Sequence, residues 1–278
     1  MRTLYVSDLD GTLLRSNART SEYTNSVINR LTAQGRLFSY ATARSFHTAK
    51  KVTEGMTAKI PLIVYNGAFI IDNVTGERML EQYFDTEVQS LLTDLFAHEV
   101  FPIVYADING QEKFSFVPAL CTPGMRRFLD SRMGDVRTRA VNSTQALCAG
   151  RIFYITCIDE PEKLLPLYEK YRGIFRCVYQ IDIYSGAQWL EMMPQAATKA
   201  NAIRQLKALL GCDRLIVFGD GQNDIDMFQT ADESYAVENA DGELKQLAAA
   251  VIPSNDADGV AHWLEQHIRE TESPGNRQ

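Results

Sequence analysis

The segment LYVSDLDGTLL, residues 4–14, joins a short run of strand-forming residues to a turn that carries two acids, Asp8 and Asp10. In an open α/β sheet, ligands bind outside the carboxyl ends of the strands, so this turn falls where a binding site is expected. Two carboxylates this close repel each other, and Mg²⁺ prefers oxygen ligands of this kind. The alternative is an ordinary solvated turn, because Asp and Gly are common turn residues.

Outward from this segment, short apolar runs alternate with amphipathic stretches, which predicts βαβ units and a parallel sheet. We expect strands at 4–7, 37–41, 60–65, 215–219, 235–237 and 250–252, and helices at 22–34, 45–54, 198–210, 223–230, 241–249 and 257–269. Between them, residues 68–82 place Asn73 and Gly76 between apolar segments, which predicts a hairpin.

The middle of the chain has a different pattern. It predicts helices at 85–99 and 161–172 and strands at 101–106, 113–117 and 151–158, with two short strands within 175–185. The turn DINGQ, residues 107–111, is typical of a hairpin. We therefore predict an α/β core with a doubly wound parallel sheet, residues 1–82 and 190–278, split by an α+β domain of residues 83–189.

Composition limits the classes of function. The 278 residues are 45% hydrophobic and 23% charged, with a net charge of -7, which argues against a nucleic-acid or anionic-membrane surface. No stretch approaches the ~18 apolar residues of a membrane span, and the first residues lack the apolar region of a signal peptide. The five cysteines are scattered and form no CxxC pair, which argues against a zinc site or a disulfide framework. We expect a cytoplasmic protein without nucleic-acid or membrane partners.

Three other places carry polar groups at strand ends or helix starts. The segment GDGQND, residues 219–224, follows the strand LIVF and offers Asp220, Asn223 and Asp224. Thr42 follows the strand LFSYA, where a hydroxyl and helix amides favour an anion. Lys199 begins a helix, where a cation is slightly unfavourable unless it faces an anion. Each has an alternative when taken alone: an acidic capping loop, an N-cap and a surface lysine.

Together, these groups predict one site for Mg²⁺ and phosphate, because a doubly wound fold gathers its strand ends at one edge. A carboxylate there can act as a nucleophile and form an aspartyl-phosphate. The metal offsets the repulsion between two anions, while Thr42 and Lys199 hold the phosphoryl oxygens.

The order SDLDGTLL, YATARS, TKANAI and FGDGQNDIDM resembles the four motifs of the haloacid dehalogenase-like hydrolase superfamily. The long insert and the NGA of residues 66–68 resemble its Cof-type branch (class IIB), which has a C2B cap on a Rossmann-like core. The resemblance implies that Asp8 is the nucleophile and a metal ligand. It implies that Asp10 is the general acid/base and gives the metal its backbone carbonyl.

The resemblance also implies phosphate binding by Leu9, Thr42, Ala43, Lys199 and Asn223, and metal binding by Asp220 and Asp224. Asp224 is either a direct ligand or an orienting group. Ala43 stands where the family has glycine; alanine keeps the amide proton but does not readily take positive φ, which leaves the Ala43 amide contact open.

The implied activity is that of a Mg²⁺-dependent phosphatase acting on a small phosphorylated metabolite, either a sugar phosphate or a phosphorylated cofactor. The insert would close as a lid and select the substrate. Asn66 and Glu191 are candidates for the substrate pocket, and the cap offers further candidates in Tyr105, Arg126, Arg127, Arg151 and Tyr184. The alternatives are a sugar phosphomutase and a phospho-accepting receiver-like module. We expect a monomer or a homodimer.

Overall fold

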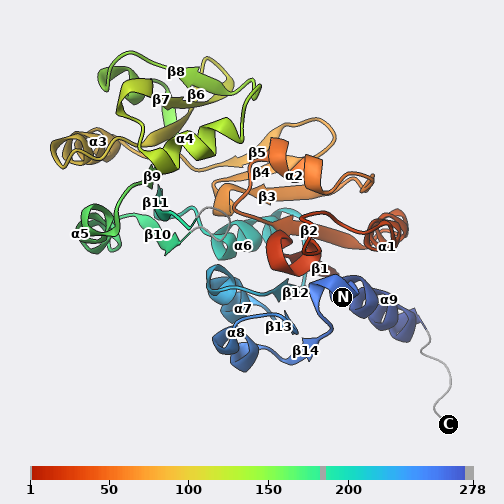
Figure 1. The fold of residues 1–278 in the computed structure, drawn as a ribbon. Coiled ribbons are helices and arrows are strands. Elements are labelled where there is room, and N and C mark those ends of the chain that lie inside the picture. The colour runs from red at the N-terminus through yellow and green to blue at the C-terminus, as the bar shows by residue number, and fades with distance from the viewer. Residues whose placement is uncertain (1, 182–185, 273–278) are drawn as a thin grey trace, which may run out of the picture. The chain divides into compact units, whose positions relative to one another are not determined.

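The computed structural model describes residues 2–181 and 186–272, so Tyr184 lies outside the described residues. The described residues form two compact units. The first lies within residues 1–81 and 198–278, and the second lies within residues 82–197. Each unit has a sheet of its own (Figure 1).

The first unit is built around β1 (Thr3–Ser7), which lies in the middle of an eight-stranded sheet of the described residues. The strand order is β14-β13-β12-β1-β2-β3-β4-β5. The other strands are β2 (Leu37–Ala41), β3 (Pro61–Val64), β4 (Phe69–Asp72), β5 (Arg78–Glu81), β12 (Arg214–Gly219), β13 (Glu233–Val237) and β14 (Ala250–Ile252). β14 to β3 pair in parallel, and β4 and β5 pair antiparallel as the predicted hairpin.

Helices cover both faces of this sheet, as the parallel strands require. They are α1 (Glu22–Ala33), α2 (Phe46–Val52), α6 (Lys199–Leu209), α7 (Ile225–Thr230), α8 (Gly242–Leu247) and α9 (Gly259–Glu272). Helices α1 and α9 contact each other on one side of the sheet, and α6, α7 and α8 form a row on the other side (Figure 1). The predicted α/β class with a parallel core sheet is confirmed.

The second unit is a six-stranded sheet in the order β10-β11-β9-β6-β7-β8, antiparallel except for the pair β7/β8. Its elements are α3 (Glu87–Ala97), β6 (Ile103–Ile108), β7 (Gln111–Phe116), α4 (Pro123–Asp130), β8 (Thr138–Ala140), β9 (Arg151–Ile158), α5 (Pro161–Tyr171), β10 (Arg176–Ile181) and β11 (Gln188–Met193). The predicted β6–β7 hairpin turns at Asn109 and Gly110, both with positive φ, as a two-residue turn requires.

Three elements of the second unit are missing from the sequence prediction: α4, β8 and β11. Residues 190–197, which the sequence analysis placed in the core, cluster with the second unit. The reason is that β11 pairs with both β9 and β10. The two short strands expected within 175–185 begin as one strand, β10, and residues 182–185 lie outside the described residues.

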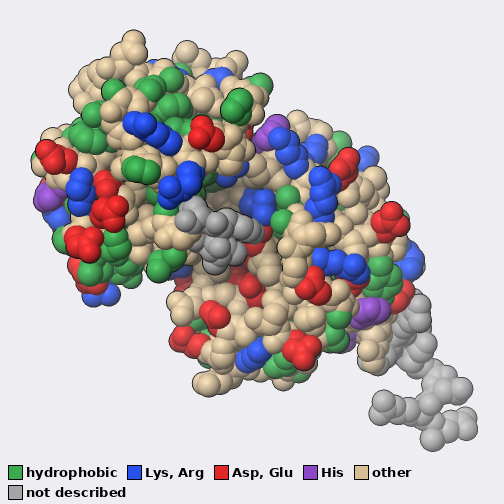
Figure 2. All heavy atoms as spheres, viewed as in Figure 1, with side chains coloured by type: hydrophobic (Ala, Val, Ile, Leu, Met, Phe, Trp, Pro, Cys, Tyr) green, Lys and Arg blue, Asp and Glu red, His purple; other side chains and the backbone are tan. Residues whose placement is uncertain are grey.

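Within the described ranges, no helix has the length and apolar character needed to cross a membrane. On the face of the molecule that Figure 2 shows, basic and acidic side chains are interspersed and do not gather by sign.

Candidate active site

The candidate site lies at the carboxyl ends of three adjacent parallel strands of the first unit. Asp8 follows β1, Thr42 follows β2, and Asp220 follows β12. Because the strand order is β12-β1-β2, these ends meet at one edge of the sheet. The Asp8 amide donates to the carbonyl of Phe218 at 2.9 Å, which continues the β1–β12 ladder up to the acids.

The chain turns sharply directly after Asp8. Residues 9–13 form a five-residue turn that the Leu14 amide closes on the Leu9 carbonyl at 2.8 Å, and within it Asp10 and Gly11 leave helical geometry. Gly11 has φ of +75°, and a Cβ on it would lie 2.2 Å from Oδ2 of Asp220. Only glycine therefore allows Asp220 to approach this turn so closely.

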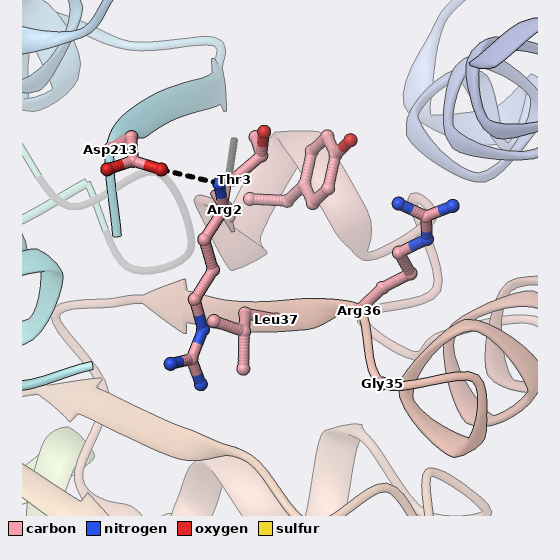
Figure 3. Close-up of a pocket in the computed structure, with 7 residues that line it drawn as sticks. Arg2, Thr3, Gly35, Arg36, Leu37 and Asp213 are labelled. Carbon is pink, nitrogen blue, oxygen red and sulfur yellow. Dashed lines mark hydrogen bonds between the residues drawn. The ribbon is translucent and has the colours of Figure 1, made fainter. Parts of the chain in front are cut away.

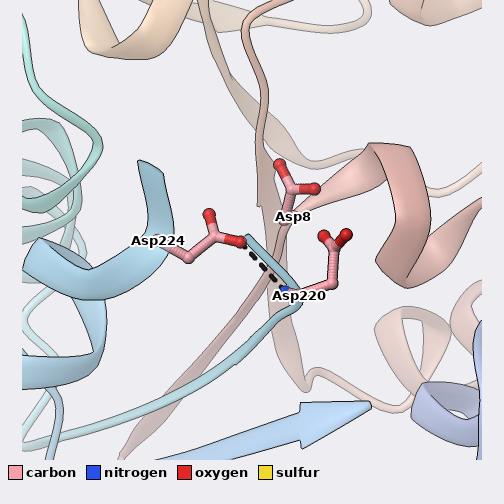
Figure 4. Close-up of side chains that lie close together, drawn as sticks. All are labelled: Asp8, Asp220 and Asp224. Carbon is pink, nitrogen blue, oxygen red and sulfur yellow. Dashed lines mark hydrogen bonds between the residues drawn. The ribbon is translucent and has the colours of Figure 1, made fainter. Parts of the chain in front are cut away.

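Three carboxylates gather at this edge: Asp8, Asp220 and Asp224 (Figure 4). Each offers one oxygen, and these oxygens lie within 4.8 Å of one another. The Thr12 hydroxyl donates to Oδ1 of Asp220 at 2.8 Å, and Oδ2 of Asp224 accepts from the amides of Asp220 and Gly221 at 3.1 and 3.2 Å. Three hard oxygen donors held in fixed orientations fit a divalent cation such as Mg²⁺.

Lys199 lies among these acids rather than on the surface. Its Nζ donates to Oδ1 of Asp8 at 2.5 Å and to Oδ1 of Asp224 at 2.7 Å, and only 3% of the residue is exposed. Burial alone would lower the pKa of Lys199, but Asp224 and Asp8 outweigh it and raise the pKa, so the ammonium stays charged. The alternative of a surface lysine is excluded.

Burial raises the pKa of Asp8 well above its ordinary value, against the opposing charge of Lys199. Burial likewise raises the pKa of Asp220 to about 6, with a further contribution from Asp224. Neighbouring carboxylates add to the effect of burial, because three acids share a single ammonium and the cluster has excess negative charge. A divalent cation is the group that would offset this charge.

Thr42 is fully buried at the end of β2, and its Oγ1 accepts from the Arg44 amide at 3.1 Å. Ala43 lies exposed between Thr42 and Arg44 in the sequence, and its φ is not positive. Its backbone is therefore one that alanine adopts without strain. Leu9 is fully buried within the turn that follows Asp8.

A strained turn at residues 65–67 contacts both Thr42 and the start of α6. Tyr65, Asn66 and Gly67 have φ of +52°, +53° and +99°. The Asn66 amide donates to the Thr42 carbonyl at 2.9 Å, and a Cβ on Gly67 would lie 2.3 Å from the carbonyl of Thr198. Left-handed backbone at non-glycine residues costs ~1–2 kcal/mol each, and such strain is typical of functional sites.

The structure places the remaining predicted residues in different ways. Asn223 is half-buried and lies between Asp220 and Asp224 in the sequence. Asn66 is buried and bonded through its amide to Thr42. Asp10 lies in the turn after Asp8, and its carboxylate pairs with Arg44. Glu191 is buried in β11 of the second unit, so it is not among the groups gathered within the first unit.

Sequence reasoning missed two asparagines that clamp the turn at residues 9–13. Nδ2 of Asn239 donates to the Gly11 carbonyl at 2.7 Å, and Nδ2 of Asn255 donates to the Leu14 carbonyl at 2.9 Å. The Asn255 amide in turn donates to Oδ1 of Asn239 at 3.0 Å. Nothing in the sequence pattern singles out these residues, because their role depends on loops more than 200 positions from the turn.

Another pocket of the first unit, about 370 Å³ in volume, lies at the amino ends of β1 and β2. Arg2 and Arg36 line it, but their guanidinium groups extend in different directions (Figure 3). Asp213 also lines it, and its carboxylate accepts from the Arg2 amide at 2.8 Å. These groups do not converge on one point, so the pocket lacks the chemistry found at the opposite edge.

Comparison with known proteins agrees with this geometry. A family model described as haloacid dehalogenase-like hydrolase matches residues 5–264. A 5-amino-6-(5-phospho-D-ribitylamino)uracil phosphatase of Bacillus subtilis is 26% identical over 280 residues, covering 93% of this chain and 96% of the relative.

Solved structures share the fold over nearly the whole chain. One from Thermotoga maritima is 25% identical with a TM-score of 0.79, covering 96% of this chain and 97% of that one. A haloacid dehalogenase-like hydrolase from Bacteroides thetaiotaomicron is 24% identical with a TM-score of 0.78, covering 96% of this chain and all of that one.

Proposed function

Because the chain belongs to the haloacid dehalogenase-like hydrolases, we propose that it hydrolyses a small phosphorylated metabolite through an aspartyl-phosphate on Asp8 with the help of Mg²⁺. The chain is a phosphoric monoester hydrolase, and its relatives are phosphatases. The single observation that carries the finer proposal is the buried group of Asp8, Asp220 and Asp224 around the Lys199 ammonium.

Two steps make up the proposed reaction. An oxygen of Asp8 attacks phosphorus while the bond from phosphorus to the leaving oxygen breaks, and the carboxyl of Asp10 gives its proton to that oxygen. Asp10 then takes a proton from water, whose oxygen attacks phosphorus and breaks the bond to Asp8. Inorganic phosphate leaves, and both carboxyl groups return to their starting states.

The residues around Asp8 have separate tasks. Lys199 holds the nucleophile and, with the Thr42 hydroxyl, would contact phosphoryl oxygens as negative charge spreads over them. The amides of Leu9 and Ala43 and the side chain of Asn223 are proposed to contact the same oxygens. The carboxylates of Asp8, Asp220 and Asp224 and the carbonyl of Asp10 would hold Mg²⁺, which supplies charge neutralisation between two anions.

The second unit is proposed to select the substrate, with Glu191 as its main candidate. Glu191 is buried in β11, opposite Thr156 of β9. Since a Bacillus subtilis relative acts on 5-amino-6-(5-phospho-D-ribitylamino)uracil, that compound heads the list of substrates, followed by sugar phosphates and other phosphorylated cofactors. A cytoplasmic location, a monomeric or homodimeric state and the lack of nucleic-acid or membrane partners remain part of the proposal.

The deciding experiment measures phosphate release across a panel of phosphorylated metabolites with Mg²⁺ and again with EDTA. We expect release that EDTA abolishes, and none with the Asp8→Asn variant. Metal-dependent turnover by Asp8→Asn would contradict the assignment of the nucleophile. Little free phosphate together with a requirement for a sugar bisphosphate would instead indicate a phosphomutase.

A further inference from the structure

Arg44 holds the side chain of Asp10 by donating a hydrogen bond to each of its two carboxylate oxygens. Nε of Arg44 donates to Oδ2 at 2.8 Å, and Nη2 donates to Oδ1 at 2.6 Å. This two-point geometry fixes the direction and the plane of a carboxylate, which a lysine ammonium does not do. The pair is partly open to solvent, with 42% of the Asp10 side chain exposed and 23% of the Arg44 side chain.

The backbone gives Asp10 little support of its own. Asp10 has ψ of 124° in the turn after β1, and the next residue, Gly11, has φ of +75°. The side chain therefore leaves a non-helical backbone, where no regular secondary structure restricts it. An exposed carboxylate in such a position samples several rotamers unless a partner holds it.

Arg44, in contrast, is anchored through its main chain. Its amide donates to Oγ1 of Thr42 at 3.1 Å, and its carbonyl accepts from the Tyr65 amide at 3.0 Å. Tyr65 begins the strained turn of residues 65–67, which also binds the Thr42 carbonyl. The guanidinium thus extends toward Asp10 from the same fixed loop that presents the Thr42 hydroxyl.

We propose that Arg44 is a positioning residue for the proton transfer: it aims the Asp10 carboxyl at the leaving oxygen relative to the phosphate held near Thr42. The inference rests on the proposed function, in which Asp10 protonates the leaving group. One Asp10 oxygen exchanges Arg44 for the leaving oxygen during this step, while the other keeps its bond to the guanidinium. Arg44 accordingly affects turnover in proportion to how much the leaving group needs a proton.

Two aryl esters separate this role from a structural one. The nitro group of p-nitrophenyl phosphate stabilises the departing phenolate, which leaves without a proton. Unsubstituted phenyl phosphate has nearly the same shape but a more basic leaving oxygen. General acid catalysis contributes about 10²–10⁴-fold where a proton is needed, so misplacing the acid affects mainly the second ester.

The test compares Arg44→Lys and Arg44→Gln with the wild type on both esters. We expect kcat for phenyl phosphate to fall roughly tenfold more than kcat for p-nitrophenyl phosphate, as a partial loss of the general acid contribution. In an Asp10→Asn background, the same substitutions should no longer distinguish the two esters, because the acid is already gone. A fall by the same factor for both esters, in either variant, would overturn the proposal and leave Arg44 a structural role in its loop.

Arg15→Lys is the matched control. Arg15 pairs with Asp258 through Nε and Nη2, which is the same two-point geometry. Asp258 is not one of the carboxylates of the candidate site. The control variant should lose stability without changing the ratio of the two rates. If the wild type itself hydrolyses neither ester nor any metabolite of the panel, the proposed function fails, and the Arg44 proposal fails with it. If the wild type hydrolyses both esters, only the Arg44 comparison is at stake.

Discussion

Alanine in place of Gly67 tests whether the strained turn at residues 65–67 fixes the position of Lys199. The new Cβ would lie 2.3 Å from the Thr198 carbonyl oxygen and 3.1 Å from the Lys199 amide. Since real Cβ contacts essentially never fall below 3.0 Å, the turn and the start of α6 must move apart by roughly 0.7 Å, the difference between 3.0 and 2.3 Å. Lys199 is the first residue of that helix.

Gly211→Ala is the control, because Gly211 follows the other end of the same helix. It has φ of +61°, and a Cβ there would meet nothing within 4 Å. Both substitutions force alanine into the left-handed region, which costs ~1–2 kcal/mol of stability. Only Gly67→Ala adds a clash against the backbone that carries Lys199.

We expect kcat of Gly67→Ala to fall on the order of 10- to 100-fold, because a displacement approaching 1 Å of a positioning group has this effect. Gly211→Ala should keep its kcat while losing stability. The assay is p-nitrophenyl phosphate hydrolysis with Mg²⁺, with thermal unfolding recorded on the same samples. Unchanged kcat in folded Gly67→Ala, or an equal loss in both variants, would refute the reasoning.

Three further predictions concern other parts of the first unit. Lys199→Gln removes the positive charge that the buried carboxylates of Asp8 and Asp224 share. It should abolish turnover and lower the free energy of unfolding by about 3–5 kcal/mol, measured by urea titration; an unchanged midpoint would contradict the buried ion pair. Against the effect of burial, the hydrogen bond from Arg15 lowers the pKa of Asp258, so its stabilising contribution is complete above about pH 4 and is lost as the pH falls through the lowered pKa. The stability difference between wild type and Asp258→Asn should therefore stay constant above about pH 4 and shrink as the pH falls below it; a difference that stays constant at low pH would exclude this ionisation as the cause. Asn239→Leu removes the donor to Gly11 and should lower Mg²⁺ affinity, measured by calorimetry, about 10-fold, since partners that orient metal-binding groups have effects of about 10–100-fold; affinity equal to that of the wild type would mean that the clamp is dispensable.

The sequence predicted the core well because its signal is local. The central strands of the parallel sheet are short apolar runs ended by polar residues, as in the segments ending at Asp8 and Asp220, and helices such as α1 have a clear period. The gathering of Asp8, Asp220 and Lys199 also followed from local signals, because a doubly wound sheet brings strand ends to one edge.

The signals that failed are not local. The sequence pattern assigns residues 190–193 of β11 to the core, and their place in the second unit follows from pairing with β10 and with β9, which ends 30 positions earlier at Ile158. The left-handed turn at residues 65–67 begins at Tyr65, an aromatic residue that rarely takes positive φ. Asn66 and Gly67 favour a turn, but no propensity rule predicts that it starts at Tyr65. The clamp by Asn239 and Asn255 is set by loop positions that only the folded sheet defines.

The first unit is discontinuous, and this has a consequence for the order of synthesis. β1 gains β2 as a neighbour once residue 41 is made, but its other neighbour, β12, ends at residue 219. The contacts that define residues 82–197 as a unit are internal, so that unit can fold on the ribosome. Residues 1–81 still lack β12 and the rest of their sheet at that stage. Until residue 224 is made, the nascent chain lacks a complete set of these carboxylates, so the site can form only after the whole second unit has been synthesised.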